Sequence, residues 1–275
     1  MKQLNSALPA HKVYPTLGSH PIEIVAEDME TYICKYSLKP AYGLLREYLG
    51  YQFAKLWGLY VPSAAFIQVA RDHVPLTQLP DRIGYVEFEI PTFGVKKHPS
   101  AEEVGLTFSQ KSDYEVRQID KEEFLKIALF DLWLANEDRH TGNYNLMLAA
   151  PDSFNKSTFF RFMPIDHWLT FNSGDMEKGI YLLSENESLL NSPVRQRLFR
   201  SKAKLVETTR RLIAHFPGWV HLCQAQVSPL LGNIPPTWGI ELPYIKSYLS
   251  DNIFRLSWVE EVKTGFTQRT QTLIN

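Results

Sequence analysis

The stretch FDLWLANEDRHTGNYNLML, residues 130–148, decides the fold of this chain. It places a carboxylate, Asp138, five positions before a carboxamide, Asn143, and a second acid, Asp166, follows 28 positions after Asp138. Phosphoryl transfer requires a group that orients the attacking hydroxyl and oxygen ligands that hold Mg²⁺ against the phosphates of a nucleotide. The spacing therefore predicts a catalytic loop in which Asp138 is the base or hydroxyl-positioning acid, and Asn143 and Asp166 are the Mg²⁺ ligands.

The sequence around this loop separates it from an ordinary turn. An Asp followed five residues later by Asn also occurs in turns and helix caps. Here the pair encloses Arg139, His140 and Gly142. An apolar helix over 121–135, capped by Asp120, precedes the loop, an apolar strand over 145–148 follows it, and a second strand over 158–165 ends at Asp166. This context favours catalysis, with Arg139 and His140 as residues that shape the loop or meet the substrate.

Composition limits the alternatives. The chain has 275 residues, a formal net charge of −1 and 44% hydrophobic residues, which is typical of a globular protein. This balance predicts no direct nucleic-acid binding, since nucleic-acid binders carry a basic excess on one face. Two cysteines, Cys34 and Cys223, are too few for a disulfide framework, and no apolar stretch predicts a signal peptide or a transmembrane helix. We therefore expect a cytoplasmic protein without a membrane segment.

Two motifs carry a resemblance to a known family. The run FDLWLANEDRHTGNYNL followed by PIDHWLTF resembles the HipA-like protein kinases. The hexamer DRHTGN is also similar to the loop of phosphatidylinositol 3- and 4-kinases, and D-x-H-x-G-N to that of aminoglycoside and choline phosphotransferases. All of them share the kinase fold. The resemblance thus implies a two-lobed α+β fold, with a β-rich amino lobe over 1–93, a mainly helical carboxyl lobe over 94–275 and ATP bound between them.

The amino lobe contains the predicted phosphate clamp. Two β-rich runs, 22–26 and 31–36, predict a hairpin. Lys35 in the second run is either an edge-strand lysine that prevents aggregation or, as the resemblance implies, the lysine that binds phosphate. Glu47, the only acid on the amphipathic helix predicted over 44–57, is the candidate partner that orients it. The resemblance also implies that Gly18 and Ser19 form a shortened phosphate-facing turn.

The remaining predictions concern the adenine site and the carboxyl lobe. We expect strands over 64–70 and 83–91, with adenine held by backbone groups of residues 87–90, which makes Glu89 and Ile90 candidate contacts. Residues 92–96 resemble the segment that follows the hinge in HipA-like chains. Further helices are predicted over 198–216 and 244–254. In Asp166-His167-Trp168 the Phe and Gly of the familiar D-F-G motif are replaced, so the flip known from other kinases is not expected here.

These observations predict an ATP- and Mg²⁺-dependent phosphotransferase. The resemblance implies a HipA-like serine/threonine kinase with a protein substrate, of the kind that acts as a toxin with an antitoxin or other regulatory partner. Two alternatives stay open on the residues alone. One is a small-molecule or phosphoinositide-like lipid kinase, and the other is a nucleotide-binding pseudokinase, which the sparse glycine turn and the altered D-F-G motif favour.

Overall fold

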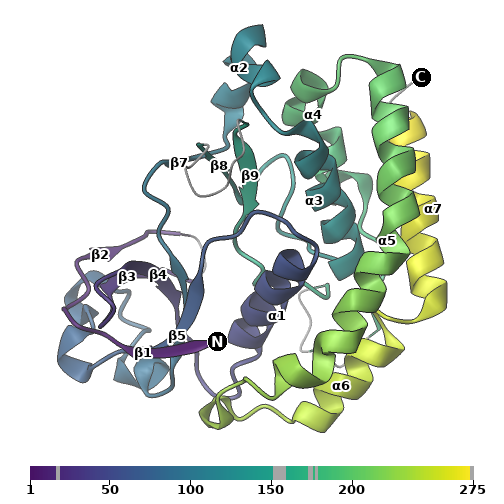
Figure 1. Cartoon of the computed structure of the whole chain (residues 1–275). Coiled ribbons are helices and arrows are strands. Elements are labelled where there is room, and N and C mark those ends of the chain that lie inside the picture. Colours follow the sequence, from purple (N-terminus) through teal and green to yellow (C-terminus); the bar gives the residue numbers. More distant parts are fainter. Residues whose placement is uncertain (17–18, 151–158, 173–175, 177–178, 273–275) are drawn as a thin grey trace. The chain divides into compact units, whose positions relative to one another are not determined.

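The computed structural model describes residues 1–16, 19–150, 159–172, 176 and 179–272 (Figure 1). The chain divides into two compact units. Unit 1 contains Met1–Tyr48, Pro62–Pro99 and Pro229–Leu242, and unit 2 contains Leu49–Val61, Ser100–Ser228 and Pro243–Asn275. The predicted boundary at residue 93 falls inside a strand, and unit 1 also takes up a segment from late in the chain.

Unit 1 is built on a six-stranded sheet with the order β1-β5-β6-β4-β3-β2. β1 is parallel to β5, and the other neighbours are antiparallel. The predicted hairpin is confirmed as β3 and β4, with Ile22 opposite Cys34. The strands are β1 (Lys2–Asn5), β2 (Lys12–Val13), β3 (Ile22–Val25), β4 (Thr31–Lys35), β5 (Ala64–Gln68) and β6 (Thr92–Lys96).

The predicted strand over 83–91 is wrong. Three short 3-10 helices connect β5 to β6: η1 (Arg71–His73), η2 (Leu76–Gln78) and η3 (Tyr85–Phe88). The backbone N–H of Gly84 donates to Glu87 Oε2 at 2.9 Å, so a local capping interaction competes with strand pairing. The true strand, β6, begins only at Thr92, after Pro91. Phe88 and Ile90 are nevertheless buried, which is why the sequence there alternates like a strand.

A segment close to the carboxyl terminus completes the core of unit 1. η7 (Pro236–Trp238) carries Trp238, which is fully buried and packs against Tyr48 and Phe66 with ring centroids 6.5 and 5.1 Å away. Its indole N–H donates to Pro91 O at 2.8 Å, and Ala41 N donates to the carbonyl of Trp238 at 3.0 Å. The run I-P-P-T-W at residues 234–238 therefore has a structural role in unit 1.

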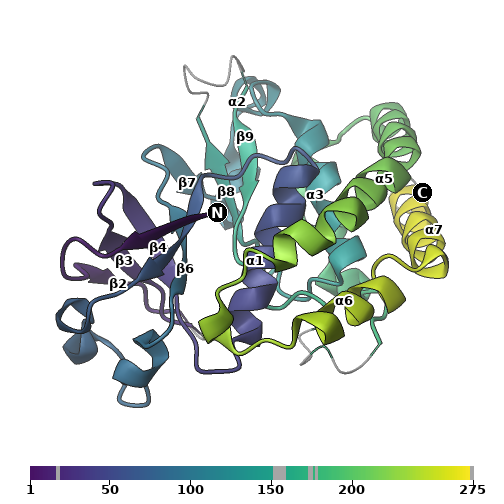
Figure 2. The same ribbon diagram turned by 60° about the horizontal axis from the view of Figure 1, so that its bottom comes forward.

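Unit 2 is mainly helical and contains a small antiparallel sheet of β7, β8 and β9 (Figure 2). α1 begins in unit 1 and ends in unit 2. The strands are β7 (Ala101–Glu103), β8 (Leu146–Ala149) and β9 (Arg161–Pro164). The α-helices are α1 (Tyr42–Leu56), α2 (Asp113–Arg117), α3 (Lys121–Leu134), α4 (Pro193–Leu198), α5 (Lys202–Leu231), α6 (Leu242–Asp251) and α7 (Leu256–Thr272), and the 3-10 helices are η4 (Leu106–Gln110), η5 (Glu185–Glu187) and η6 (Leu189–Asn191).

The central helix of unit 2 is α3, close to the predicted bounds. Asp120 caps its first turn by accepting hydrogen bonds from Glu122 N at 3.1 Å and Glu123 N at 3.3 Å. Every residue from Glu123 to Leu134 except Lys126 is buried. The indole N–H of Trp258 on α7 donates to Trp133 O at 3.0 Å, which joins the two helices. α3 is thus a rigid support for the loop that follows it.

α5 is longer than predicted. The expected end at residue 216 rested on Pro217, since a proline inside a helix removes a hydrogen bond and costs about 3 kcal/mol. The helix instead continues to Leu231, because Phe216, Val220 and Cys223 extend one buried stripe past the proline. None of the described helices combines the length and apolar character needed to cross a membrane.

Candidate active site

Lys35 and Glu47 form an ion pair within unit 1. Lys35 is the last residue of β4, and its ammonium donates to Glu47 Oε1 on α1. Both residues are buried, with 9% and 4% of their surface exposed. β4 lies between β6 and β3, so the edge-strand explanation for Lys35 is wrong. Lys35 lies on an inner strand and is bound by a glutamate from a neighbouring helix. Its charge is therefore fixed in one place, as phosphate binding requires.

The connection between β2 and β3 holds the predicted glycine turn. Gly18 lies outside the described residues, and Ser19 is half-buried. His20, which has a left-handed backbone with φ 45°, donates its N–H to Thr16 Oγ1 at 3.2 Å. The hydroxyl of Tyr36, next to Lys35, donates to His20 O at 3.0 Å. One hydrogen bond therefore ties this turn to the end of the strand that carries the lysine.

Glu23 anchors the base of the same turn. Its carboxylate accepts hydrogen bonds from Tyr14 Oη, from His11 Nε2 at 2.8 Å and from Lys97 Nζ at 2.9 Å. Burial alone would raise the pKa of Glu23, but these three donors hold it at about 2. Glu23 is therefore an ionised, fully paired carboxylate in unit 1, and it fixes the strands on both sides of the turn.

In unit 2, Asp138 lies in the loop that follows α3. Ala135 takes a left-handed conformation with φ 48° and ends the helix. Asn143 Nδ2 donates to Asp138 Oδ1 at 2.9 Å, and Asn145 Nδ2 donates to Asp138 Oδ2 at 2.9 Å. Each carboxylate oxygen is thus held by a separate amide of the same loop. The predicted pair Asp138 and Asn143 is in direct contact, whereas the role of Asn145 was missed.

His140 and Asn143 close the tip of this loop. Their backbones exchange two hydrogen bonds, at 2.9 and 3.0 Å, around Thr141 and Gly142. The N–H of Gly142 donates to His140 Nδ1 at 3.0 Å. The turn presents Asn143 at an exposed position while its amide nitrogen remains bonded to Asp138. The amide oxygen of Asn143 is therefore the atom that a cation could use.

Arg139 is fully buried and connects the loop to its surroundings. It donates to Asp131 Oδ1 on α3, to Asn145 O at 3.2 Å and to Ile165 O at 2.6 Å. Because Arg139 has no exposed surface, it cannot contact a substrate. Of the two roles that the sequence allowed, shaping the loop or meeting the substrate, its geometry fits the first. We refer to Arg139, Asp131 and the two carbonyls that accept hydrogen bonds from Arg139 as the arginine clamp.

Asp131 is the buried acid of this clamp. Its Oδ1 also accepts from Asn136 Nδ2 at 3.2 Å, and its Oδ2 has no hydrogen-bond partner among the described residues. Burial raises the pKa of Asp131 to about 6, although Arg139 and Asn136 oppose the rise. The charge of Asp131 is consequently tolerated only because Arg139 lies against it.

Asp166 reaches this region through the pairing of β8 and β9. Leu146 lies opposite Pro164, and Ile165 N donates to Asn145 O at 3.0 Å. The start of β8 and the end of β9 therefore share one end of the sheet, which places Asp166 on the same side as the loop. Asp166 has a left-handed backbone with φ 58°, and its Oδ1 accepts from Trp168 N at 3.2 Å. The pairing of β8 with β9 therefore brings Asp166 toward the loop, although 28 positions separate it from Asp138 in the sequence.

His167, the residue after Asp166, is buried and fixed. Its ring contacts Phe130 with centroids 6.0 Å apart. A Cβ added to Gly50 would lie 2.4 Å from His167 Cβ, so only glycine fits opposite it. This packing opposes a flip of the segment, in line with the expectation from the sequence.

The donor set of unit 2 fits Mg²⁺. One carboxylate, Asp166, and one amide oxygen, Asn143, are hard oxygen ligands. The described residues contain no group of three or more His, Cys, Asp or Glu side chains that could hold an ion alone. Mg²⁺ is usually bound by one or two protein oxygens together with phosphates of a nucleotide, and this set matches that pattern.

The two predicted adenine contacts have different surroundings from those expected. Glu89 is exposed and Ile90 is buried, and both precede β6 instead of lying within the last strand before the carboxyl lobe, as predicted. Residues 97–99 are the part of unit 1 that leaves β6 and leads into unit 2. The last strand was assigned one segment too early, and the contacts of Glu89 and Ile90 with adenine stay a prediction.

Comparison with known proteins identifies a family and two similar structures. The model of the HipA-like kinase family matches residues 18–253. The structure is similar to that of the Helicobacter pylori proinflammatory kinase CtkA, with a TM-score of 0.55 and 14% identity over 98% of this chain and 99% of that one. It also matches the Golgi casein kinase with Mn/ADP bound, with a TM-score of 0.43 and 11% identity over 95% of this chain and 73% of that one. A comparison with curated protein sequences gave no match.

The fold is therefore a mixed α+β, kinase-like fold, as predicted. The chain belongs to the HipA-like kinase family, since the family model covers most of its length. Family and fold are those of a phosphotransferase of the protein-kinase type.

Proposed function

We propose that this chain is an ATP- and Mg²⁺-dependent serine/threonine protein kinase. The observation that carries the proposal is the arrangement around Asp138, whose two oxygens are held by the amides of Asn143 and Asn145. A carboxylate fixed in this way can orient an attacking hydroxyl and accept its proton. Asp166 reaches the same end of the sheet through the β8–β9 pairing.

The proposed roles follow from these contacts. Asp138 positions the hydroxyl, and Asn143 and Asp166 offer their oxygens to the metal. Lys35, oriented by Glu47, neutralises phosphate oxygens, and the β2–β3 turn with Gly18 and Ser19 covers them. ATP supplies the phosphoryl group when bound, and Mg²⁺ neutralises part of its charge. Since β6 is the last strand before the connection to unit 2, we place the adenine contacts in residues 97–99 in preference to Glu89 and Ile90.

Phosphate transfer from labelled ATP tests the proposal. Asp138→Asn should leave ATP affinity close to that of the parent and lower transfer by about 10²-fold or more, the usual effect of losing a positioning or acid–base group. Asp166→Asn should weaken Mg²⁺-dependent nucleotide binding instead, because an amide is neutral where the ion requires charge. Asp251→Asn, which changes an exposed acid on α6, is the matched control and should behave like the parent. Full transfer by the Asp138 variant would refute the mechanism.

The choice of acceptor tests the substrate class in the same assay. Protein, inositol-lipid and aminoalcohol acceptors are offered in parallel, and we expect transfer to Ser or Thr of a protein. Transfer to a lipid or small molecule alone would make this a different phosphotransferase, and no transfer by the parent would make it a nucleotide-binding pseudokinase.

The family likeness extends the proposal to a toxin-type kinase with a protein partner that restrains it. Both cysteines are unpaired and buried, which suits a reducing compartment such as the cytoplasm. Induced expression should then arrest growth with the parent and not with Asp138→Asn. Normal growth under expression of an active enzyme would exclude a toxic role.

A further inference from the structure

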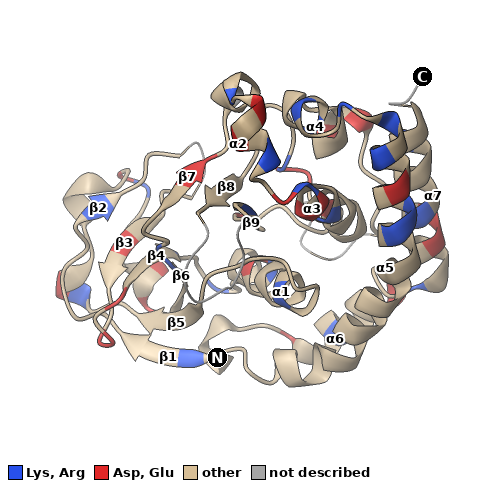
Figure 3. Ribbon diagram, turned by 45° about the horizontal axis from the view of Figure 1, so that its top comes forward, with Lys and Arg blue, Asp and Glu red and all other residues tan. Residues whose placement is uncertain are grey.

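Positive charge is concentrated where four segments of unit 2 meet. Lys121 begins α3, Arg117 ends α2, Arg197 is in α4, Arg200 follows α4, and Lys204 is in the first turn of α5. We call these five residues the basic patch. Residues 193–211 alone contain seven Lys or Arg and one acid, in a chain whose net charge is −1. Figure 3 shows Lys and Arg positions gathered on α4 and the upper part of α5.

Only part of this charge is balanced within the protein. Asp113 serves two cations at once, with its Oδ1 2.7 Å from Arg197 and 3.2 Å from Arg200. Arg117, Lys121 and Lys204 make no ion pair within the described residues. Arg117 and Lys204 are exposed. Among the described residues Asp113 is thus the one carboxylate that pairs with the basic patch, since the nearby Glu115, Glu122 and Glu207 pair with Lys111 and Arg211 instead.

The cations of the basic patch repel one another in the folded protein. The pKa of Lys121 is lowered, first by its partial burial and then by Lys204, Arg197, Arg117 and Arg200. Such repulsion lowers the stability of the fold, and proteins keep unfavourable arrangements mainly where binding requires them. A shallow hollow beside the patch is lined by Ser201, Ala203, Lys204, Glu207, Thr208 and Arg211.

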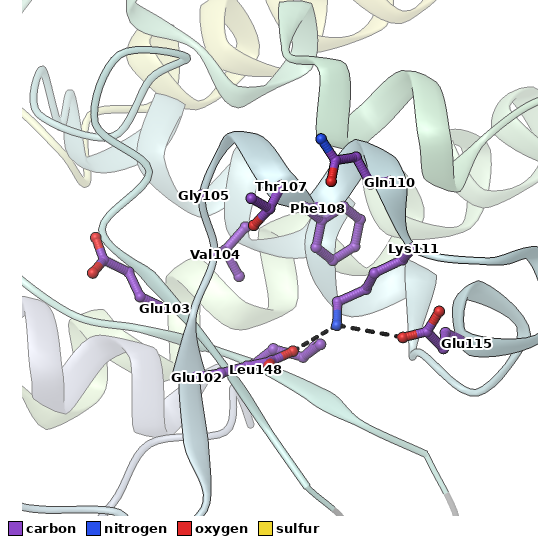
Figure 4. A pocket seen from close by; sticks show the side chains of 10 residues that line it. All are labelled: Glu102, Glu103, Val104, Gly105, Thr107, Phe108, Gln110, Lys111, Glu115 and Leu148. Atoms are coloured by element: carbon purple, nitrogen blue, oxygen red, sulfur yellow. Dashed lines mark hydrogen bonds and ion pairs between the residues drawn. The ribbon is translucent and has the colours of Figure 1, made fainter.

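A second pocket of unit 2 shows the contrast. In the pocket of Figure 4, the ammonium of Lys111 lies 2.6 Å from Glu102 and 3.9 Å from Glu115. Its charge is matched by the protein's own carboxylates, and nothing there requires a ligand. The basic patch differs because its charge exceeds that of its own acids.

We propose that the basic patch docks a segment of a protein partner that is rich in Asp and Glu. Asp113 shows the chemistry, since its carboxylate bridges two guanidinium groups of the patch. A peptide can add carboxylates one at a time beside the free cations. A nucleic acid carries a phosphate every ~3.4 Å along each strand, so some phosphates would face Asp113, Glu122 or Glu207, whereas a peptide can place uncharged residues opposite these acids. The acidic peptide is therefore the better match.

Binding of a short fluorescein-labelled peptide of alternating Glu and Ser, measured by anisotropy without nucleotide, tests this docking surface. Lys121→Glu/Lys204→Glu should lower the affinity at least about tenfold, because two attractive contacts become repulsive. The matched control, Lys55→Glu/Lys246→Glu, makes the same change of charge at exposed positions of unit 2 and should alter the affinity less than about twofold. Rising salt should weaken binding by the parent.

Folding is not expected to confuse the result. Lys121 and Lys204 occupy first turns of helices, where an acid is favourable. The Lys121→Glu/Lys204→Glu variant should therefore melt at or above the temperature of the parent. Lys121→Gln/Lys204→Gln provides a neutral second version. The proposal is overturned if the parent binds a Lys–Ser peptide equally well, or if the control variant loses as much affinity. Tighter, patch-dependent binding of oligothymidine would overturn it in favour of nucleic acid. Because no phosphate transfer is measured, the outcome is independent of the proposed kinase activity.

Discussion

Replacing Arg139 by Met should destabilise unit 2 strongly, and the loss should depend on pH. The substitution keeps a side chain of similar length and removes every donor of the arginine clamp. Asp131 would keep only the amide of Asn136, the carbonyl of Ile165 would lose the donor Arg139, and the carbonyl of Asn145 would keep only Ile165 N. Removing one member of a buried ion pair costs about 3–5 kcal/mol, because the other charge is left buried without compensation.

The pH dependence follows from the sign of the pKa shift of Asp131. Its pKa is already raised to about 6 by burial, and Arg139 opposes that rise. Without Arg139 the pKa in the folded state must rise further above the value in the unfolded chain. The folded variant then binds a proton more tightly than the unfolded chain does, so its stability falls as pH rises from about 4 through the folded pKa, by at most ~1.4 kcal/mol per pH unit. The variant should thus be closest to the parent in acid.

Urea unfolding followed by tryptophan fluorescence measures this, because Trp133, two residues after Asp131 on α3, is buried in the folded protein. The free energy of unfolding is compared at acid and neutral pH for the parent, Arg139→Met, Asp131→Asn and the double variant. We expect Asp131→Asn to rescue part of the loss in the double variant at neutral pH, since no uncompensated charge remains. A loss under about 0.5 kcal/mol, or one that does not change with pH, would refute the reasoning that Asp131 is a buried charge held by Arg139.

Three further changes test unit 1. Lys35→Met/Glu47→Gln should weaken nucleotide binding and should melt above Lys35→Met, because the single variant leaves the Glu47 carboxylate buried without Lys35. Nucleotide binding as tight as that of the parent would show that Lys35 serves only the fold. Glu23 has its pKa lowered from 4.5 to about 2, so it stabilises the parent above pH 4.5 by roughly 3 kcal/mol relative to Glu23→Gln, and this difference should vanish as pH falls through 2. Equal acid unfolding of the two proteins would contradict that. Trp238→Ala should cost about 3–5 kcal/mol in urea unfolding, since Trp238 is fully buried, and a cost below 1 would mean that residues 229–242 are dispensable to unit 1.

The sequence predicted those parts of the fold that depend on local patterns. The hairpin β3–β4, the helices α1 and α3 and the order of the loop and the second acid all follow from periodicity, capping residues and short spacing. Lys35 and Glu47 are separated by twelve residues and were paired correctly, because the family resemblance singled out Lys35 and Glu47 is the only acid on the predicted helix.

The errors arose where distant segments decide the structure. Residues 83–91 alternate between apolar and polar side chains because Phe88 and Ile90 are buried. Burial of residues in or just after a 3-10 helix gave the same sequence pattern as burial in a strand. The helix over 198–216 was cut short by a proline whose local cost is outweighed by packing farther along α5. Trp238 donates to Pro91, which lies 147 positions earlier, and no local signal connects them.

The candidate site shows the same division within one loop. Spacing and the flanking sequence singled out Asp138 and Asn143, but this interpretation assigned the amide of Asn143 only to the metal. In the structure the nitrogen of Asn143 binds Asp138 and its oxygen remains for a cation, so one amide can serve both groups. A carboxylate at this position would bind an ion more strongly, but it has no N–H to donate and would repel Asp138. The contact with Asp138 therefore favours Asn at position 143 independently of the proposed ion. That contact becomes evident only once the loop is closed by the backbone bonds between His140 and Asn143.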